Sequence, residues 1–120
     1  MGQFSPLVSV EWLAANIGEP AVRVLDCTVH LHPLPGGDMR TESGLADFET
    51  RHIPGAGFAD LIESLSDPGS PLRFTLPDAE RFATAMGWLG AGADTYLVLY
   101  ADQAYWATRL WWMLRHFGFD

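Results

Sequence analysis

Residues 96–108, YLVLYADQAYWAT, decide the fold. The first five, YLVLY, form a continuous apolar run with aromatic and β-branched residues, which predicts a strand buried in a sheet. A tight loop over 101–105 separates this run from a helical pattern that begins near Trp106. The order of buried strand, short loop and amphipathic helix is typical of an α/β domain.

Amphipathic helices are predicted on both sides of this strand. The helix before it begins at Asp78 and is broken by Gly90 and Gly92, and Gly118 caps the helix after it. Apolar residues recur in both at three- and four-residue spacing, so each helix presents one face to a core. These positions are Ala79, Phe82, Ala83, Met86 and Leu89 in the first helix, and Trp106, Leu110, Met113, Leu114 and Phe117 in the second.

Trp111 and Trp112 are neighbours within the last helix. Adjacent helical residues point in different directions. We therefore expect one of them to face the core and the other an interface.

The N-terminal part of the chain alternates in the same way. Residues 22–26, VRVLD, predict a buried strand, and Ser9 can cap a short helix over 10–17 that precedes it. Residues 30–43 are polar and rich in proline and glycine, which predicts a long loop that is functional or disordered.

The middle of the chain completes the pattern. A short helix over 45–51 ends before Pro54, because proline pushes the preceding residue out of the helical region. A short strand over 57–61 and a loop over 66–76 follow. Strands that alternate with helices predict an α/β domain with a mainly parallel sheet. At this length, residues 1–120 are expected to form a single domain.

Composition excludes several classes of function. The chain carries 15 acidic and 7 basic residues, a formal charge of −8, which disfavours binding to nucleic acid. No apolar run reaches the roughly 18 to 20 residues of a membrane helix, and the N-terminal sequence does not have the pattern of a secretory signal, so we expect a cytoplasmic protein without membrane contact. The single cysteine, Cys27, excludes an internal disulfide.

Residues 47–61, DFETRHIPGAGFADL, resemble the rhodanese motif, in which a strand and loop lead to a turn of the form G-H-I-P-G-A. Arg51 replaces the first glycine of that turn. We expect His52 to be a turn residue whose ring forms a hydrogen bond with nearby backbone. Residues 66–90 and 107–120, the latter ATRLWWMLRHFGFD, extend the similarity to the N-terminal domain of thiosulfate and 3-mercaptopyruvate sulfurtransferases.

This resemblance implies a rhodanese-like three-layer α/β/α fold. In the family a further strand follows the last helix and lies inside the sheet, and a second copy of the fold comes after a linker. The printed sequence contains neither, so the resemblance implies an N-terminal domain that is incomplete at its C-terminal end and lacks its last strand. The expected partner is a second rhodanese domain or a complementing chain, and self-association is the alternative.

The resemblance also implies transfer of sulfane sulfur, from thiosulfate or 3-mercaptopyruvate to a thiol or cyanide acceptor. A covalent persulfide needs a thiolate where backbone N–H groups converge at a strand-loop-helix junction. The family's catalytic copy has its cysteine at the position of Ala101, which has no nucleophile, and Asp102 adds unfavourable negative charge. We predict that this chain alone is not an enzyme and needs no cofactor.

Three further residues take roles from the resemblance. Tyr105 and Trp106 correspond to aromatic residues that line the cleft between the two domains, and Arg109 would anchor the start of the last helix. Packing of Trp106 against the sheet is the alternative.

Asp26 ends a predicted strand. Acidic residues at the carboxyl ends of parallel strands line ligand crevices, or they cap backbone N–H groups. Cys27 is expected to be a small buried hydrophobe. Its proximity to His30 and His32 also suggests a weak zinc set, for which no fourth ligand is evident, so no metal site is assigned.

Two rival functions follow. One is a free-standing inactive rhodanese module whose aromatic loop binds a partner. The other is a metal-binding domain that uses Cys27, His30 and His32.

Overall fold

The computed structural model describes residues 7–118. Its main sheet has three parallel strands in the order β4-β1-β5, made by β1 (Val22–Asp26), β4 (Gly57–Phe58) and β5 (Tyr96–Tyr100). β1 is central, and its five residues pair in register with the five of β5. The predicted α/β class and parallel sheet are confirmed.

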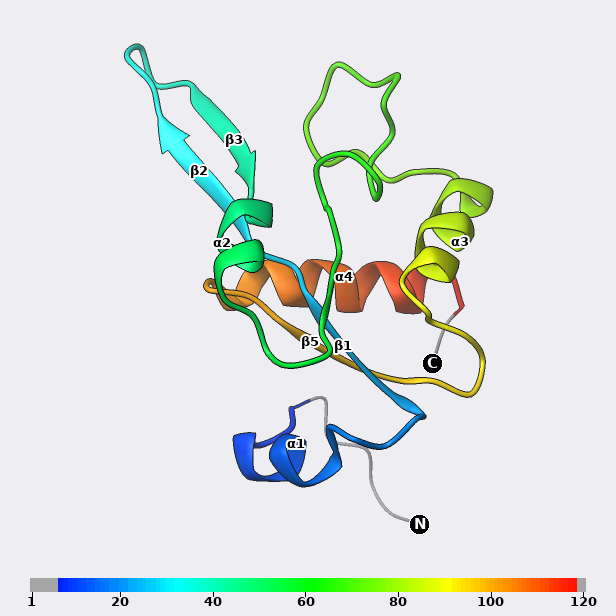
Figure 1. Ribbon diagram of the computed structural model, residues 1–120. Helices are drawn as coiled ribbons and strands as arrows, with labels where there is room; N and C mark the ends of the chain where they lie inside the picture. Colours follow the sequence, from blue (N-terminus) through cyan, green and yellow to red (C-terminus); the bar gives the residue numbers. More distant parts are fainter. Residues whose placement is uncertain (1–6, 119–120) are drawn as a thin grey trace.

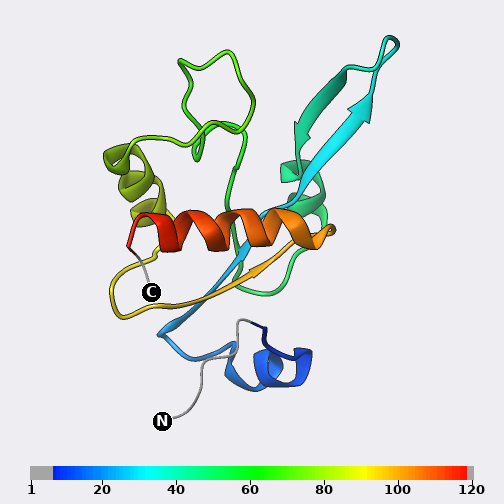
Figure 2. The ribbon, with the colours of Figure 1, turned by 180° about the vertical axis from the view of Figure 1, so that it is seen from behind.

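Two helices cover one face of this sheet. These are α3 (Ala79–Trp88) and α4 (Ala104–His116), which lie on the same side of the sheet in both views (Figure 1, Figure 2). Asp78 caps α3 by accepting a hydrogen bond from the Arg81 backbone N–H at 2.7 Å, as the sequence predicts. The core between these helices and the sheet contains Leu25, Cys27, Phe82, Met86, Trp106, Leu110, Met113 and Leu114.

A short helix, α1 (Val10–Asn16), lies on the other side of the sheet (Figure 1). Ser9 caps it and accepts the Trp12 N–H at 3.0 Å. The ring of Trp12 lies 5.2 Å from that of Tyr96 in β5. Helices on both sides of the sheet give the three α/β/α layers that the resemblance implies.

The expectation of an irregular loop over 30–43 is wrong. The strands β2 (Val29–Pro33) and β3 (Met39–Ser43) form an antiparallel hairpin that projects from the body of the domain (Figure 1). Gly36 and Gly37 both have positive φ, +89° and +88°, and with Pro35 they make a turn between two strands. The hairpin leads into α2 (Leu45–Thr50).

The predicted strand over 57–61 is too long. β4 contains only Gly57 and Phe58, because the chain turns at Asp60, whose Oδ1 accepts the N–H groups of Ile62 and Glu63. The buried side chain of Leu61 contributes to the core without belonging to a strand.

The prediction that Trp111 or Trp112 faces the core is also wrong. The two side chains are 41% and 44% exposed, and the buried positions of α4 are those that the helical spacing predicts. Each indole lies under an arginine of the same helix, Arg115 over Trp111 at 5.1 Å and Arg109 over Trp112 at 5.5 Å.

β5 has one neighbour among the described strands. Tyr96 N–H donates to Ala21 and Tyr100 C=O accepts from Cys27, so these residues bond toward β1. Since backbone groups alternate along a strand, Leu97 and Leu99 direct theirs to the open edge. The residues expected to precede a further strand, Phe119 and Asp120, lie outside the described range. Within that range no helix is long and apolar enough to cross a membrane.

Candidate functional site

The carboxyl end of β1 is buried and hydrogen-bonded to neighbouring backbone. Asp26 is 6% exposed, its Oδ1 accepts the Thr28 N–H at 2.9 Å and its C=O accepts the Ala59 N–H at 2.9 Å. These bonds give Asp26 the backbone-binding role that the sequence left open beside a ligand role.

Cys27 lies inside the core and has no exposed surface. Its backbone N–H donates to the Tyr100 C=O at 2.8 Å, which extends the β1–β5 pairing by one residue. Burial, with a smaller contribution from the negative charge of Asp26, raises the pKa of the thiol far above its ordinary value. The thiol therefore stays protonated and inaccessible, which is the opposite of what a nucleophile needs.

The loop after β5 is where a nucleophile would be expected. Ala101 is half-buried at the edge of the core, and the N–H of Asp102 donates to Thr28 Oγ1 at 3.1 Å. Gln103 is the N-cap of α4, but its side chain makes no capping hydrogen bond. The junction thus has the expected strand-loop-helix form without a reactive side chain.

The turn at residues 52–56 is tied to the end of β5. The Ile53 N–H donates to the Tyr100 hydroxyl at 3.2 Å. Desolvation is the largest influence on Tyr100 and raises its pKa. His52 stacks on Phe48 with 4.1 Å between ring centroids, and its Nδ1 lies 2.6 Å from the Phe48 C=O, as expected for a turn histidine.

The two predicted cleft residues differ in exposure. Tyr105 is 55% exposed, whereas Trp106 is 7% exposed and belongs to the core. The Trp106 ring lies 5.2 Å from Phe74 and 4.9 Å from Tyr105. Its buried indole Nε1 has no hydrogen-bond partner among the described residues, which is costly for a buried donor. Their role as a cleft wall stays a prediction.

Phe74 has a left-handed backbone, with φ +58°, a conformation that bulky residues rarely adopt. The guanidinium of Arg109 donates to the Phe74 C=O and thereby holds this strained turn against α4. Desolvation lowers the pKa of Arg109. Arg109 thereby ties α4 to a loop that the sequence did not indicate as its partner, while its role in anchoring the start of this helix stays a prediction.

A hollow of about 240 Å³ lies beside Phe74. Residues of β3 and of the loop before α3 line it, and Phe74 connects it to the Trp106 cluster. Its lining residues are Thr41, Ile62, Asp67, Pro68, Ser70, Pro71, Leu72, Arg73 and Phe74.

The candidate zinc residues do not converge. His30 Nε2 lies 2.7 Å from an Asp47 carboxylate oxygen, and His32 Nε2 lies 2.8 Å from a Glu42 carboxylate oxygen. The bond to His32 lowers the pKa of Glu42. Cys27 is enclosed in the core, and within residues 7–118 no group of three or more ligand-type side chains is placed to hold a metal ion.

Sequence reasoning missed Thr28, Phe74 and Tyr100. Each acts through a contact with a residue distant in sequence: Asp102, Trp106 and Ile53 respectively. A local pattern does not reveal such contacts, although the position of the polar Thr28 two residues after the predicted strand over 22–26 was an available signal.

Known proteins resemble this chain over most of its length. It is 45% identical to human 3-mercaptopyruvate sulfurtransferase over 119 residues, which are 93% of this chain and 38% of that protein. Identity to the Escherichia coli 3-mercaptopyruvate sulfurtransferase is 40%, over 94% of this chain and 38% of the relative. Identity to the Cricetulus griseus thiosulfate sulfurtransferase is 38%, over 96% and 38%. No family model matches the chain.

Solved structures agree. The crystal structure of SseA from Escherichia coli, described as having the rhodanese fold, superposes with a TM-score of 0.73 at 40% identity, over 92% of this chain and 40% of that one. A sulfur transferase subunit of yeast mitochondrial complex I gives a TM-score of 0.77 at 25% identity, over 97% and 37%.

The fold and its superposition on the SseA structure define a rhodanese-like α/β domain. The chain is related to the 3-mercaptopyruvate and thiosulfate sulfurtransferases, and it spans about 38% of the length of those relatives.

Proposed function

We propose that this chain acts as the non-catalytic, N-terminal rhodanese domain of a sulfurtransferase. A second rhodanese domain would carry the persulfide that moves sulfane sulfur from thiosulfate or 3-mercaptopyruvate to a thiol or cyanide acceptor. This domain would supply one side of the cleft, with Tyr105 and Trp106 as its wall. The cytoplasm is the compartment we propose.

One observation carries this proposal. The only cysteine, Cys27, is completely buried with a raised pKa, while Ala101 occupies the junction where a thiolate would be needed. Sulfur transfer through a persulfide requires an accessible thiolate. The relatives that share 38–45% identity are named as sulfurtransferases, which favours a non-catalytic role of this domain in the same chemistry.

Thiocyanate formation tests the proposal. The purified chain, given thiosulfate or 3-mercaptopyruvate with cyanide, is expected to form no thiocyanate above the uncatalysed rate. Thiocyanate formation that disappears in a Cys27→Ser variant would overturn the assignment of a non-catalytic domain.

The open edge of β5 favours a protein partner for this domain. The outward backbone groups of Leu97 and Leu99 lie in an apolar strand that carries no charge or proline to discourage pairing. We propose that this edge accepts a strand, from a complementing chain or from a second copy. Backbone groups at such an edge are otherwise left to water.

Amide exchange and melting test this partner. At low concentration the Leu97 and Leu99 amides are expected to exchange quickly, and at high concentration to be protected while the melting temperature rises. A sharp, concentration-independent melting transition of a monomer would contradict pairing at this edge.

A further inference from the structure

Trp88 is the last residue of α3, and its side chain is 87% exposed. Its indole makes no ring contact or hydrogen bond with any other described residue. Tryptophan is enriched where proteins bind one another, because its indole offers a large apolar surface with a polar edge. An exposed indole that borders a cavity can contact a ligand bound there.

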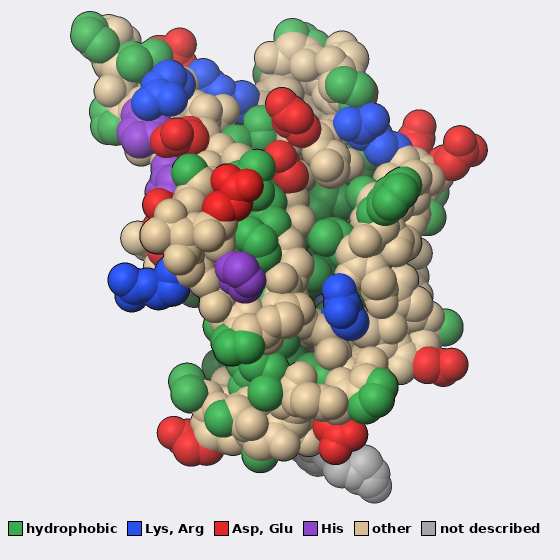
Figure 3. Space-filling view, viewed as in Figure 1, with side chains coloured by type: hydrophobic (Ala, Val, Ile, Leu, Met, Phe, Trp, Pro, Cys, Tyr) green, Lys and Arg blue, Asp and Glu red, His purple; other side chains and the backbone are tan. Residues whose placement is uncertain are grey.

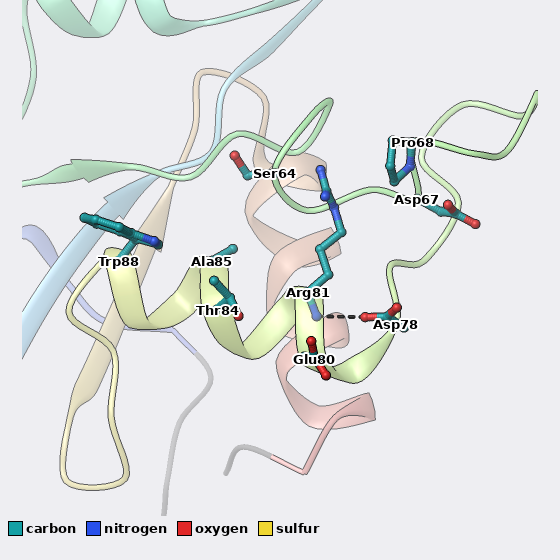
Figure 4. A pocket seen from close by; sticks show the side chains of 9 residues that line it. All are labelled: Ser64, Asp67, Pro68, Asp78, Glu80, Arg81, Thr84, Ala85 and Trp88. Carbon is teal, nitrogen blue, oxygen red and sulfur yellow. Dashed lines mark hydrogen bonds between the residues drawn. The ribbon is translucent and has the colours of Figure 1, made fainter.

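Such a cavity lies alongside α3. A groove of about 600 Å³ runs between this helix and the segment that contains Ser64, Asp67 and Pro68 (Figure 4). Trp88 lies at one end of the groove, while Asp67 and Asp78 lie toward the other (Figure 4). Glu80, Thr84 and Trp88 follow one another at four-residue spacing along the helix.

The groove is negatively charged. Three carboxylates line it, from Asp67, Asp78 and Glu80, against one cation, Arg81. The Arg81 guanidinium donates to the backbone oxygens of Ser66 at 3.0 Å and Glu63 at 2.7 Å. Among the described residues it forms no ion pair with these carboxylates. Acidic side chains are visible over the start of α3 at the upper right of Figure 3.

The carboxylates keep free acceptor positions. Asp78 and Asp67 use one oxygen each, for the N–H groups of Arg81 and Gly69. The Glu80 carboxylate makes no hydrogen bond or ion pair with any described residue. A ligand that brings cations would thus find acceptors at one end and an aromatic face at the other.

We propose that this groove binds an arginine-bearing segment of a partner protein, with one guanidinium stacked on Trp88 and another paired with Glu80. Arginine fits both ends, since its planar guanidinium stacks on indole and bonds carboxylates in bidentate fashion. The formal charge of −8 favours the approach of a basic partner. This site is independent of the proposed sulfur transfer.

The helix sets the spacing of the two arginines. Glu80 and Trp88 are separated by eight residues of α3, or about 12 Å at about 1.5 Å per residue. An extended peptide rises about 3.3 Å per residue, so side chains about four residues apart cover this span and point to the same side. Arginines with that spacing should bind best.

Fluorescence anisotropy with a labelled peptide tests the site. The probe is a short extended peptide with two arginines at that spacing, compared with lysine-substituted and respaced versions. We expect the full chain to bind the first peptide best, and Trp88→Ala and Glu80→Gln each to weaken binding by about tenfold, or about 1.4 kcal/mol. Far-UV circular dichroism confirms that the variants fold.

Two matched controls distinguish binding in the groove from nonspecific electrostatic or hydrophobic binding elsewhere. Glu49→Gln removes an equal charge on α2, and Leu72→Ala removes another exposed apolar side chain. Both are expected to bind as the parent chain does. The proposal is overturned if no peptide binds, if Glu49→Gln weakens binding as much as Glu80→Gln, or if lysine and arginine peptides bind equally.

Discussion

The loops that follow β1 and β5 lie side by side at the carboxyl end of the sheet and are held very differently. The β1 loop, residues 26–28, is buried, and its side chains bond its own backbone and that of its neighbours. The β5 loop, residues 101–103, is half-buried to exposed and leads into a helix whose N-cap side chain makes no bond. The difference suggests that the β1 loop is structural, while the β5 loop is held by its neighbour.

Steric crowding of the β1 loop should have the largest effect. A Cβ on Gly44 would lie 2.7 Å from the Thr28 Cβ and 2.8 Å from the Thr28 C=O, too close to be accommodated without a backbone shift. We expect Gly44→Ala to lower the free energy of unfolding by about 3 kcal/mol, measured by urea denaturation. Gly18→Ala, where nothing lies within 4 Å of the added Cβ, is the control and should be nearly neutral.

Alkaline pH should destabilise the domain through the β1 loop. The pKa of Cys27 is raised in the folded state, so the native protein holds this proton above the pH at which the unfolded chain releases it. Stability is therefore complete below the unfolded pKa of about 8.5 and falls above it by about 1.4 kcal/mol per pH unit for this group. Tyr100, whose pKa is also raised, adds to the fall from about pH 10.

Cys27→Ala separates the two contributions. The variant loses stability at neutral pH, because a core side chain is truncated. Between pH 8.5 and 10, however, its free energy of unfolding should fall by about 2 kcal/mol less than that of the parent chain. Denaturant midpoints across this range provide the measurement. Equal slopes for the parent chain and the variant would show that Cys27 is not the titrating group.

The link between the two loops should have an intermediate effect. Thr28→Val keeps the shape of the side chain but removes the oxygen that accepts the Asp102 N–H. We expect a loss of about 1 to 2 kcal/mol and faster hydrogen exchange at the Asp102 amide. Thr84→Val, at an exposed position of α3, controls for the change of residue type. Unchanged exchange at Asp102 would mean that the β5 loop is not held by Thr28.

Local periodicity predicted the elements of this fold well, because an amphipathic helix reports its own buried face. The buried residues of α4, Trp106, Leu110, Met113 and Leu114, are those that the spacing predicts. The hairpin at 29–43 was missed because its strands are short and one of them ends in Pro33, so its prolines and glycines were interpreted as a loop although only Pro35, Gly36 and Gly37 lie in the turn. The exposure of Trp111 and Trp112 depends on the width of the core, which spacing does not give.

The candidate site was less predictable. The chemistry of single positions, such as the lack of a nucleophile at Ala101, is visible in the sequence. The contacts that shape the site join residues far apart: Thr28 with Asp102, Ile53 with Tyr100, and Arg109 with Phe74. Burial of Trp106 with an unpaired Nε1 depends on Phe74 in its strained turn, and only the three-dimensional structure brings them together.

The smallest expected effect is a gain in stability at the β5 loop. Ser9 and Asp78 cap α1 and α3 with side-chain oxygens, whereas Gln103 has the extended backbone of an N-cap and no capping bond. The Trp106 N–H in the first turn of α4 donates only to the Gln103 C=O, at 3.1 Å, so Gln103→Ser should add a side-chain acceptor there and raise the free energy of unfolding by about 0.5 to 1 kcal/mol. Gln103→Ala, which shortens the side chain without adding an acceptor, serves as the control in the same thermal melts. If both variants change stability equally, the first turn of α4 already has its N–H groups satisfied, and the two loops would be less different than their hydrogen bonds suggest.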